Sequence, residues 1–179
     1  VPEMIIVKHL NGTNDWWVYN KDLNGGTNPA SYFLKLNTSD AEILNSGGSV
    51  FQGTSPTSTV FYGGSALTAS GRQMIAYCFH SVSGYSKINE YTGSGSGNTQ
   101  AVTTGFQPDW ILIKDYIGGG SWWIQDSVRG DDKWLKAQSS NAETTVSYVD
   151  FTSTGFTVTG GLNDNSVNSK FIYMAFKIN

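Results

Sequence analysis

The sequence predicts an all-β protein, an antiparallel β-sandwich of the jelly-roll or concanavalin-like kind that contains an internal duplication. Three observations support this class. Aromatic residues make up 13% of the 179 residues and glycines number 21, whereas only 14% of the residues are charged. Short runs of β-branched and aromatic residues end in turns rich in Gly, Asn and Ser, which is typical of strands. Finally, a set of sequence blocks occurs twice in the same order.

The repeated blocks define two sequence repeats, residues 2–79 and 105–178. Each repeat begins with an apolar run that ends in a lysine, continues with a Trp-Trp pair and closes with a strand that ends in phenylalanine. We predict a single domain over residues 1–179, in which a hairpin over 86–104 links the repeats. The matching blocks are 2–8 with 108–114, 15–20 with 121–126, 33–42 with 134–143, 57–61 with 152–156, and the strands that end at Phe79 and Phe176.

The Trp-Trp pairs, Trp16-Trp17 and Trp122-Trp123, lie at equivalent positions of the two repeats. Because successive side chains of a strand point to opposite faces, the two indoles of a pair must separate. We therefore expect one ring of each pair to enter the core and its neighbour to face the other side.

Helical signals are confined to two short segments, 39–42 and 140–143. Both carry Ser followed three residues later by Glu, which is the capping-box pattern, and no apolar stripe of helical period follows. We predict one short helical turn per repeat. The single cysteine, Cys78, lies in the apolar run 74–79 and is predicted to be a small core residue.

Lys8 and Lys114 also occupy equivalent positions, each at the end of an apolar strand. A lysine at the same position beside the core in both repeats favours an ion pair at the edge of the domain. The expected partners are acids of the same repeat, Asp15 or Glu42 for the first lysine and Asp126 or Glu143 for the second.

Composition and motifs argue against several functions. A net charge of −3 without a cluster of basic residues argues against nucleic acid as a partner. The sequence lacks an apolar run long enough to insert in a membrane. His9 and His80 are not spaced as a metal pair, no nucleophile elbow or phosphate loop occurs, and the carboxylates are too scattered to nominate a catalytic pair. We therefore predict that the protein is not an enzyme, and a sandwich-fold glycoside hydrolase is the weakest alternative.

The strongest binding hypothesis rests on the aromatic residues. Sugars stack their C–H faces on indole rings, and flanking polar side chains orient their hydroxyl groups. This favours a ligand site formed by the two Trp pairs, with Asp126, Arg129 and Tyr116 as further candidates. The alternative is that the rings are buried in the core or in contacts between subunits.

Two acidic loops are candidate calcium sites, since hard cations require several oxygens from one loop. The first contains Asp126, Asp131 and Asp132, and the second contains Asp164. The alternative for the first loop is a solvated turn in which Arg129 pairs with a nearby carboxylate. For the second loop, Asx side chains commonly bond their own backbone in turns. No other cofactor is predicted.

The second repeat carries a recognisable order of blocks: GFQPDWILIK at 105–114, the Trp pair, DSVRG at 126–130, SNAET at 140–144, FTSTGFTV at 151–158 and YMAF at 173–176. This order resembles lectin-like β-sandwich modules of bacteriophage tail-fibre and other virion proteins. The resemblance implies a non-enzymatic module on the virion surface, made in the host cytoplasm, that attaches to a host-surface glycan. It also implies a homo-oligomer, with trimers as the usual fibre symmetry. The alternative is a purely structural assembly or decoration subunit that contacts other virion subunits.

Overall fold

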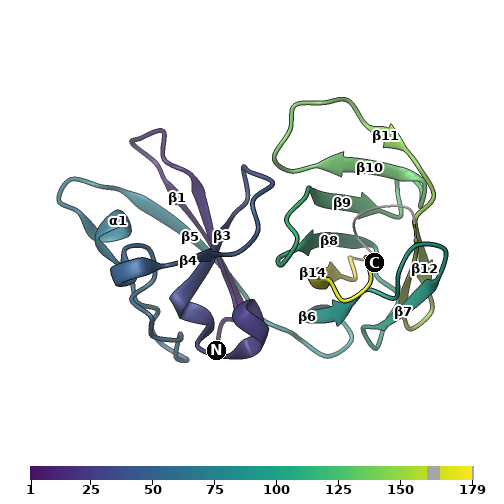
Figure 1. Cartoon of the computed structure of the whole chain (residues 1–179), viewed down its shortest axis with the longest axis horizontal. Coiled ribbons are helices and arrows are strands. Elements are labelled where there is room, and N and C mark those ends of the chain that lie inside the picture. The colour runs from purple at the N-terminus through teal and green to yellow at the C-terminus, as the bar shows by residue number, and fades with distance from the viewer. Residues whose placement is uncertain (161–165, 179) are drawn as a thin grey trace. The chain divides into compact units, whose positions relative to one another are not determined.

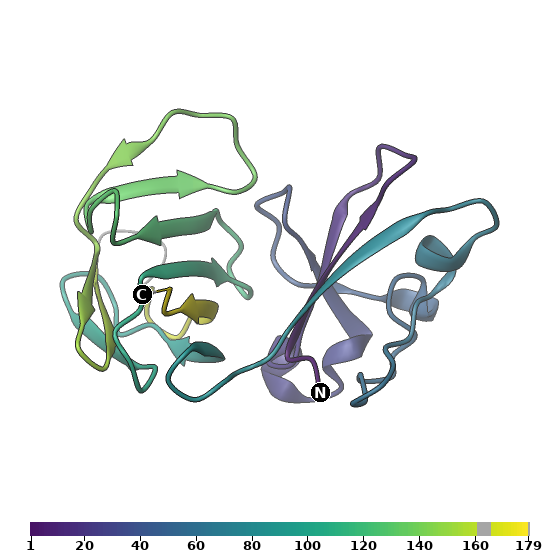
Figure 2. The same ribbon diagram turned by 180° about the vertical axis from the view of Figure 1, so that it is seen from behind.

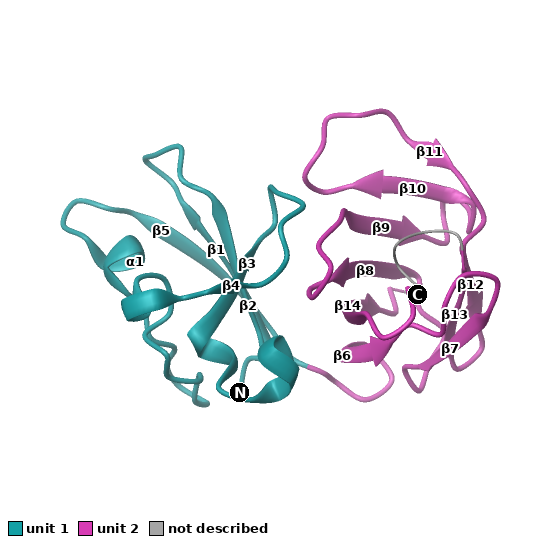
Figure 3. Ribbon diagram, viewed as in Figure 1, with its two compact units in different colours: residues 1–80 teal, residues 81–179 magenta. Residues whose placement is uncertain are grey.

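The computed structural model describes residues 1–160 and 166–178. The chain divides into two compact units, unit 1 over residues 1–80 and unit 2 over residues 81–179 (Figure 3). Each predicted repeat lies within one of these units, and the expectation of a single domain stays a prediction. In the described part of the chain the strands form three antiparallel sheets, which confirms the all-β class.

Unit 1 contains one five-stranded sheet in the order β4-β3-β2-β1-β5 (Figure 1). Its central strands are rich in β-branched and aromatic residues, as is typical of strands. The strands are β1 (Met4–His9), β2 (Trp16–Asn20), β3 (Tyr32–Lys35), β4 (Ile43–Leu44) and β5 (Met74–Phe79).

Unit 2 contains a six-stranded sheet in the order β11-β10-β9-β8-β14-β6 and a three-stranded sheet in the order β12-β13-β7. The first sheet consists of β6 (Ser86–Thr92), β8 (Trp110–Asp115), β9 (Trp122–Asp126), β10 (Lys133–Lys136), β11 (Thr144–Thr145) and β14 (Lys170–Phe176). The second consists of β7 (Thr99–Thr103), β12 (Val149–Thr152) and β13 (Gly155–Thr159).

The two sheets of unit 2 share one hydrophobic core and therefore form a β-sandwich. The six-stranded sheet contributes Ile111, Ile113 and Tyr173, and the three-stranded sheet contributes Phe156 and Val158. All five side chains are at most 2% exposed. Alternation along each strand sends these residues to the inner face, which is the pattern that a two-layer sandwich requires.

The core of unit 1 lies on one face of its sheet and is covered by a chain segment in place of a second sheet. Ile5 and Val7 of β1 and Trp17 of β2 pack with Phe51 and Leu67 from the segment between β4 and β5. The short helices of unit 1 are η1 (Leu23–Gly26), η2 (Pro29–Ser31), η3 (Ser46–Gly48) and α1 (Ser65–Thr68).

The two larger sheets have the same connectivity over five strands. The order β4-β3-β2-β1-β5 of unit 1 matches β11-β10-β9-β8-β14 of unit 2. The register matches too, since Lys8 pairs with Trp16 and Lys114 pairs with Trp122. Such shared pairings are what descent from one ancestral unit predicts, and the duplication itself stays a prediction.

The hairpin expected over residues 86–104 does not form. The strand β6 pairs with β14 at the edge of the six-stranded sheet, whereas β7 pairs with β13 in the three-stranded sheet. The glycine-rich segment between them therefore carries the chain from one layer of the sandwich to the other. The prediction was wrong because a turn signal indicates that the chain changes direction and does not specify which strands pair.

The helical turns predicted at 39–42 and 140–143 are also absent, since neither segment is helical. In both, the glutamate that would complete the capping box has a distant partner. Glu42 accepts the backbone N–H of Asn24 at 2.7 Å, and Glu143 accepts the guanidinium of Arg129 at 3.2 Å. The two glutamate carboxylates on which the capping box depends are therefore bound in tertiary contacts.

Residues 57–61 match residues 152–156 in sequence but form no strand, and the Thr57 hydroxyl accepts the backbone N–H of Val60 at 3.1 Å in a local turn. One further expectation for unit 1 was wrong. Cys78 is exposed and does not lie in the core. It belongs to β5, which ends its sheet.

Candidate functional site

The two Trp pairs separate across their sheets as the sequence predicted. Trp17 belongs to the core of unit 1, and Trp123 packs against the core of unit 2. Their neighbours Trp16 and Trp122 project from the opposite faces, because strand residues alternate. Trp17 and Trp122 are 6% and 1% exposed, whereas Trp16 and Trp123 are half-buried. Only the latter two indoles can therefore contact a ligand without a change in fold.

The indole ring of Trp123 packs against two side chains of unit 2. The ammonium of Lys136, which lies opposite on β10, sits 4.7 Å from the ring centroid. The edge of the ring meets Trp134 with centroids 5.6 Å apart and an interplanar angle of 85°. A cation over the face of an indole and an edge-to-face partner are both favourable contacts. Trp123 is consequently best described as a packing residue.

Trp16 lies beside a polar frame at the end of the unit 1 sheet where β1 ends, β2 begins and β3 ends. Its backbone N–H donates to Asn37 Oδ1 at 2.8 Å, and Asn37 Nδ2 donates to Asp15 Oδ1 at 2.8 Å. Lys35 Nζ lies 2.9 Å from Asp15 Oδ2, and the Lys8 ammonium sits 5.8 Å from the Trp16 ring centroid. We call Asp15, Trp16, Lys35 and Asn37 the Trp16 rim.

Strand pairing places the members of the Trp16 rim together. Lys35 lies opposite Trp17 in the β2–β3 ladder, and the backbone N–H of Leu36 donates to the carbonyl of Trp16 at 2.9 Å. Asn37 then follows in the turn after β3, where its side chain can reach back to the start of β2. The rim is thus fixed by two adjacent strands, although Asn37 itself is exposed.

Electrostatics keep the rim carboxylate charged. Hydrogen bonds from Asn37 and Lys35 lower the pKa of Asp15 below its ordinary value of 3.8, and they outweigh the partial burial, which acts in the opposite direction. Asp15 is therefore an anion at neutral pH, with two oxygens that accept hydrogen bonds. The carboxylate, the amide and the Lys35 ammonium of the rim are bound to one another at the backbone of Trp16. Because paired residues share a face, Lys35 leaves the sheet on the face of Trp17, whereas the Trp16 indole lies on the opposite face with the Lys8 ammonium 5.8 Å from its centroid.

The equivalent position in unit 2 has the same frame but no accessible ring. The backbone N–H of Trp122 donates to Gln138 Oε1 at 3.0 Å, as that of Trp16 does to Asn37. Ser121 stands where unit 1 has Asp15, and Trp122 is 1% exposed. Unit 2 therefore retains the amide that binds the backbone N–H of the first Trp, but it lacks the carboxylate and the accessible indole.

The ion pairs expected for Lys8 and Lys114 are replaced by bonds to backbone carbonyls. Lys8 Nζ donates to the carbonyl of Asn14 at 2.5 Å, and Lys114 Nζ donates to that of Gly120 at 2.8 Å. Each ammonium also lies over the first Trp of its repeat. The Lys8 ammonium is 5.8 Å from the centroid of the Trp16 ring, and the Lys114 ammonium is 6.0 Å from that of Trp122. Turn carbonyls thus provide the acceptors that sequence reasoning had assigned to carboxylates.

The loop after β9 is held by Arg129. Its Nε lies 2.6 Å from Asp126 Oδ2, and its Nη1 lies 3.2 Å from Glu143. Burial alone would raise the pKa of Asp126, but the hydrogen bonds and the charge of Arg129 lower it below 3.8. Asp126 and Arg129 are therefore brought together as the alternative interpretation of this loop expected.

The calcium hypothesis gains no geometric support from this loop. Asp131 is exposed, and Asp132 lies 3.5 Å from the Lys133 ammonium. Over residues 1–160 and 166–178, no three acidic, His or Cys side chains are grouped as a metal site would require. The other candidate, Asp164, lies outside the described residues, and calcium binding stays a prediction.

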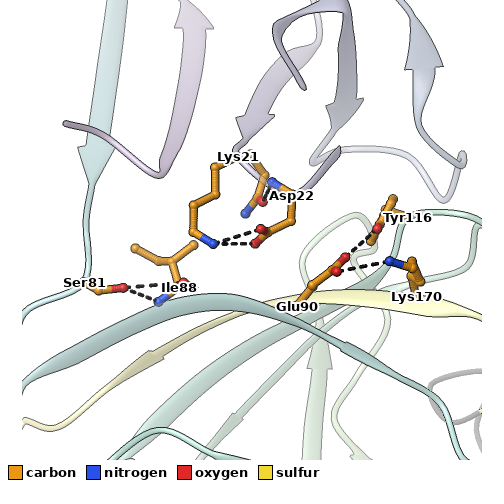
Figure 4. A network of polar contacts seen from close by, with 8 residues as sticks. Lys21, Asp22, Ser81, Ile88, Glu90, Tyr116 and Lys170 are labelled. Atoms are coloured by element: carbon orange, nitrogen blue, oxygen red, sulfur yellow. Dashed lines mark hydrogen bonds and ion pairs between the residues drawn. The ribbon is translucent and has the colours of Figure 1, made fainter. Parts of the chain in front are cut away.

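Tyr116 is not the exposed ring that its loop-like sequence suggested. It is fully buried at the end of β8, and its hydroxyl donates to Glu90 Oε2 at 2.6 Å (Figure 4). Lys170 Nζ binds the other oxygen of the same carboxylate at 3.1 Å. These three side chains join β6, β8 and β14 within unit 2, so Tyr116 has a structural place and cannot meet a ligand at the surface.

Sequence reasoning identified Trp16 but did not nominate Lys35 or Asn37. The available signal was the repeat itself, since Asn37 and Gln138 occupy equivalent positions and both carry a side-chain amide. Their common role, which is to accept the backbone N–H of a Trp on the adjacent strand, depends on the β2–β3 and β9–β10 pairings. A sequence of polar residues after a strand does not reveal that partner.

The fold defines an all-β protein, and unit 1 leaves a half-buried indole, Trp16, at the end of its sheet. More particularly, the chain belongs to the family described as Domain of unknown function (DUF7483), whose model matches residues 1–179 and so covers both units. No curated protein and no solved structure matches the chain. Within the described residues, no helix is long and apolar enough to cross a membrane.

Proposed function

We propose that this chain is a non-enzymatic bacteriophage virion module, on a tail fibre, spike or capsid surface, that binds a host-surface glycan. The virion context rests on the resemblance of the second repeat to lectin-like modules of phage proteins. The glycan rests on one observation in the structure, the Trp16 rim. Of the two half-buried paired indoles, Trp123 packs against Lys136 and Trp134, whereas Trp16 stands at the end of its sheet, where an amide that holds a carboxylate binds its backbone N–H.

The rim suits a sugar for physical reasons. A pyranose presents a face of C–H groups that packs on an indole, and its hydroxyls require acceptors and donors at the ring edge. Asp15 supplies charged acceptors, Asn37 supplies both an acceptor and a donor, and the Lys35 ammonium supplies donors. Because these groups already bind one another, little side-chain entropy is lost when a ligand binds. Water-exposed groups of this kind give modest affinity per site, which repetition in an oligomer would raise.

A glycan array with matched tryptophan variants tests the proposal. Trp16→Ala removes the proposed stacking face, and we expect at least about a tenfold loss of affinity for any bound glycan, equivalent to about 1.4 kcal/mol. Trp123→Ala is the control, since it also removes a half-buried indole of a Trp pair, although Trp123 is the second member of its pair and Trp16 the first. Circular dichroism would establish that both variants are folded.

The Asp15→Asn variant provides a second test that spares the ring. It keeps the size of the side chain and removes the negative charge, so it should weaken binding while the fold is retained. If the wild-type protein binds glycans and Trp16→Ala and Asp15→Asn bind as tightly as the parent, the rim is not the site. If Trp123→Ala alone loses binding, the site lies in unit 2.

An assembly role is the second candidate, and one observation favours it. The edge strand β5 of unit 1 exposes apolar side chains, and within the described residues it pairs with a strand on one side only. The glycoside hydrolase alternative requires two carboxylates on either side of a scissile bond. Incubation with host polysaccharide followed by an assay for new reducing ends tests it directly, and their appearance would contradict the non-enzymatic proposal.

A further inference from the structure

The five-stranded sheet of unit 1 ends at β5, whereas the equivalent strand of unit 2 has a further neighbour. β14 pairs with β8 on one side and with β6 on the other over seven residues. β5 pairs with β1 alone, and no other strand of the described chain lies beside it (Figure 2). The position that β6 fills in unit 2 is therefore vacant in unit 1.

The main-chain groups of β5 are arranged to accept another strand. The backbone N–H of Leu10 donates to the carbonyl of Gln73 at 2.8 Å, so the odd-numbered residues of β5 are those that bond with β1. The N–H and C=O groups of Met74, Ala76 and Cys78 consequently point to the open edge. In unit 2 the equivalent residues of β14 are those that bond with β6, as Lys177 does with Tyr85 at 2.8 Å.

Side-chain packing shows the same vacancy. In unit 2, Tyr91 of β6 stacks on Phe171 with ring centroids 4.8 Å apart and is 7% exposed. In unit 1, the equivalent region is open and contains two hollows along β5. The first, of about 290 Å³, is lined by Val7, Phe61, Gly63, Leu67, Thr68, Met74 and Ala76. The second, of about 240 Å³, is lined by Pro2, Thr57, Ser58, Thr59, Val60, Phe61 and Cys78.

The sequence of β5 contains neither charged residues nor proline, two devices that commonly protect an edge strand from pairing. Its sequence is MIAYCF, and Tyr77 is 44% exposed. Soluble proteins commonly protect edge strands with lysines, prolines or bulges. A neutral, apolar and unprotected edge is the surface expected of a strand that pairs with another chain.

We propose that β5 pairs antiparallel with β5 of a second copy of this chain, about a two-fold axis at Ala76. The two sheets then continue across the contact as one. Ala76 lies opposite Ala76, and Met74 lies opposite Cys78 of the second copy on the face that carries the hollows. Ile75 lies opposite Tyr77 of the second copy on the other face. This inference does not depend on glycan binding.

The occupant is a second copy because β5 is complementary to itself. A two-fold contact must join a surface to its own image, and a neutral strand does so without placing like charges opposite each other. The register about Ala76 pairs all three outward-facing residues of each strand. It also brings each Met74 to the mouth of the hollow beside Cys78 of the other copy, and the unbranched, flexible methionine side chain is well suited to fill irregular space.

The oligomeric state of the full chain, measured by analytical ultracentrifugation over a range of concentrations, tests the proposal. We expect a species of twice the chain mass of 19.4 kDa. Ala76→Pro removes the N–H at the two-fold axis from both copies and leaves the bonds to β1 intact, since proline is tolerated where an edge faces solvent. It should weaken the dimer by at least about tenfold.

Ala101→Pro is the matched control. Ala101 is exposed on β7, which also ends its sheet, and its N–H points off the sheet because the even-numbered residues of β7 bond with β13. This variant should dimerise like the parent. Ala76→Lys keeps the backbone N–H and places two ammonium groups opposite each other, so it should also weaken the dimer without the backbone effects of proline.

Three outcomes would overturn the proposal. The first is a chain that stays monomeric at every concentration. The second is an oligomer that Ala76→Pro and Ala76→Lys leave unchanged. The third is a monomer that binds a synthetic peptide of residues 86–92, the β6 sequence, which would mean that the edge accepts a strand other than β5. Trp16→Ala should leave dimerisation unchanged, so failure of the glycan proposal and failure of this one are distinguishable.

Discussion

The buried hydroxyl of Tyr116 offers a sharp test of the unit 2 fold. Tyr116→Phe removes the donor to Glu90 Oε2, at 2.6 Å, and leaves the ring in place. A hydrogen bond to a charged partner contributes about 1.5–3 kcal/mol to stability. Because Lys170 still binds the other carboxylate oxygen, we expect a loss at the lower end, about 1.5–2 kcal/mol in the free energy of unfolding.

Urea unfolding at neutral pH measures this loss, and native-state hydrogen exchange at the amides of β6 and β14 would assign it to unit 2. Tyr85→Phe is the matched control, since that ring is 55% exposed and its variant should lie within about 0.5 kcal/mol of the parent. A Tyr116→Phe variant as stable as the Tyr85→Phe variant would refute the assignment of the hydroxyl to a structural role.

Two further predictions concern unit 2. Arg129→Met should lower stability by less than about 1 kcal/mol at pH 7, since the pair with Asp126 is partly exposed. The folded pKa of Asp126 is below 3.8, so its contribution is present above the unfolded pKa and is lost as the pH falls through the folded value. Unfolding curves of variant and parent should therefore converge as the pH is lowered below 3.8 and through the folded pKa. Gly155→Ala would place a Cβ against the carbonyl oxygen of Val102 and should lower the free energy of unfolding by about 3 kcal/mol. Gly47→Ala is its control in unit 1, because a Cβ there meets open space at positive φ, and it should lower the same free energy by about 1 kcal/mol.

Strand positions and faces were predictable because they depend on short-range rules. Apolar runs of β-branched residues marked β1 and β8, and the alternation of side chains separated Trp16 from Trp17 and Trp122 from Trp123. The order of sequence blocks indicated that the two halves would pair their strands alike. None of these inferences required knowledge of which segment lies against which.

Expectations were wrong where the structure of a segment depends on contacts with residues distant in the chain. Ser39 with Glu42 satisfies the capping-box pattern, but Glu42 bonds with Asn24 of a different element. Cys78 lies in a run as apolar as any core strand, yet its exposure follows from the absence of a neighbour beside β5 in the described chain. The local sequence indicates which structure a segment prefers. It does not show which distant groups compete for its hydrogen bonds or which strands cover it.

The amino-acid sequence by itself determined the all-β class, the strands and the opposite placement of paired indoles, because composition and two-residue periodicity act within a few residues. Tertiary structure alone decided which indole stays accessible, which amide and carboxylate surround it, and which strand edge remains open. Those features depend on pairings between strands distant in the chain, and solvent exposure is set by what those pairings cover.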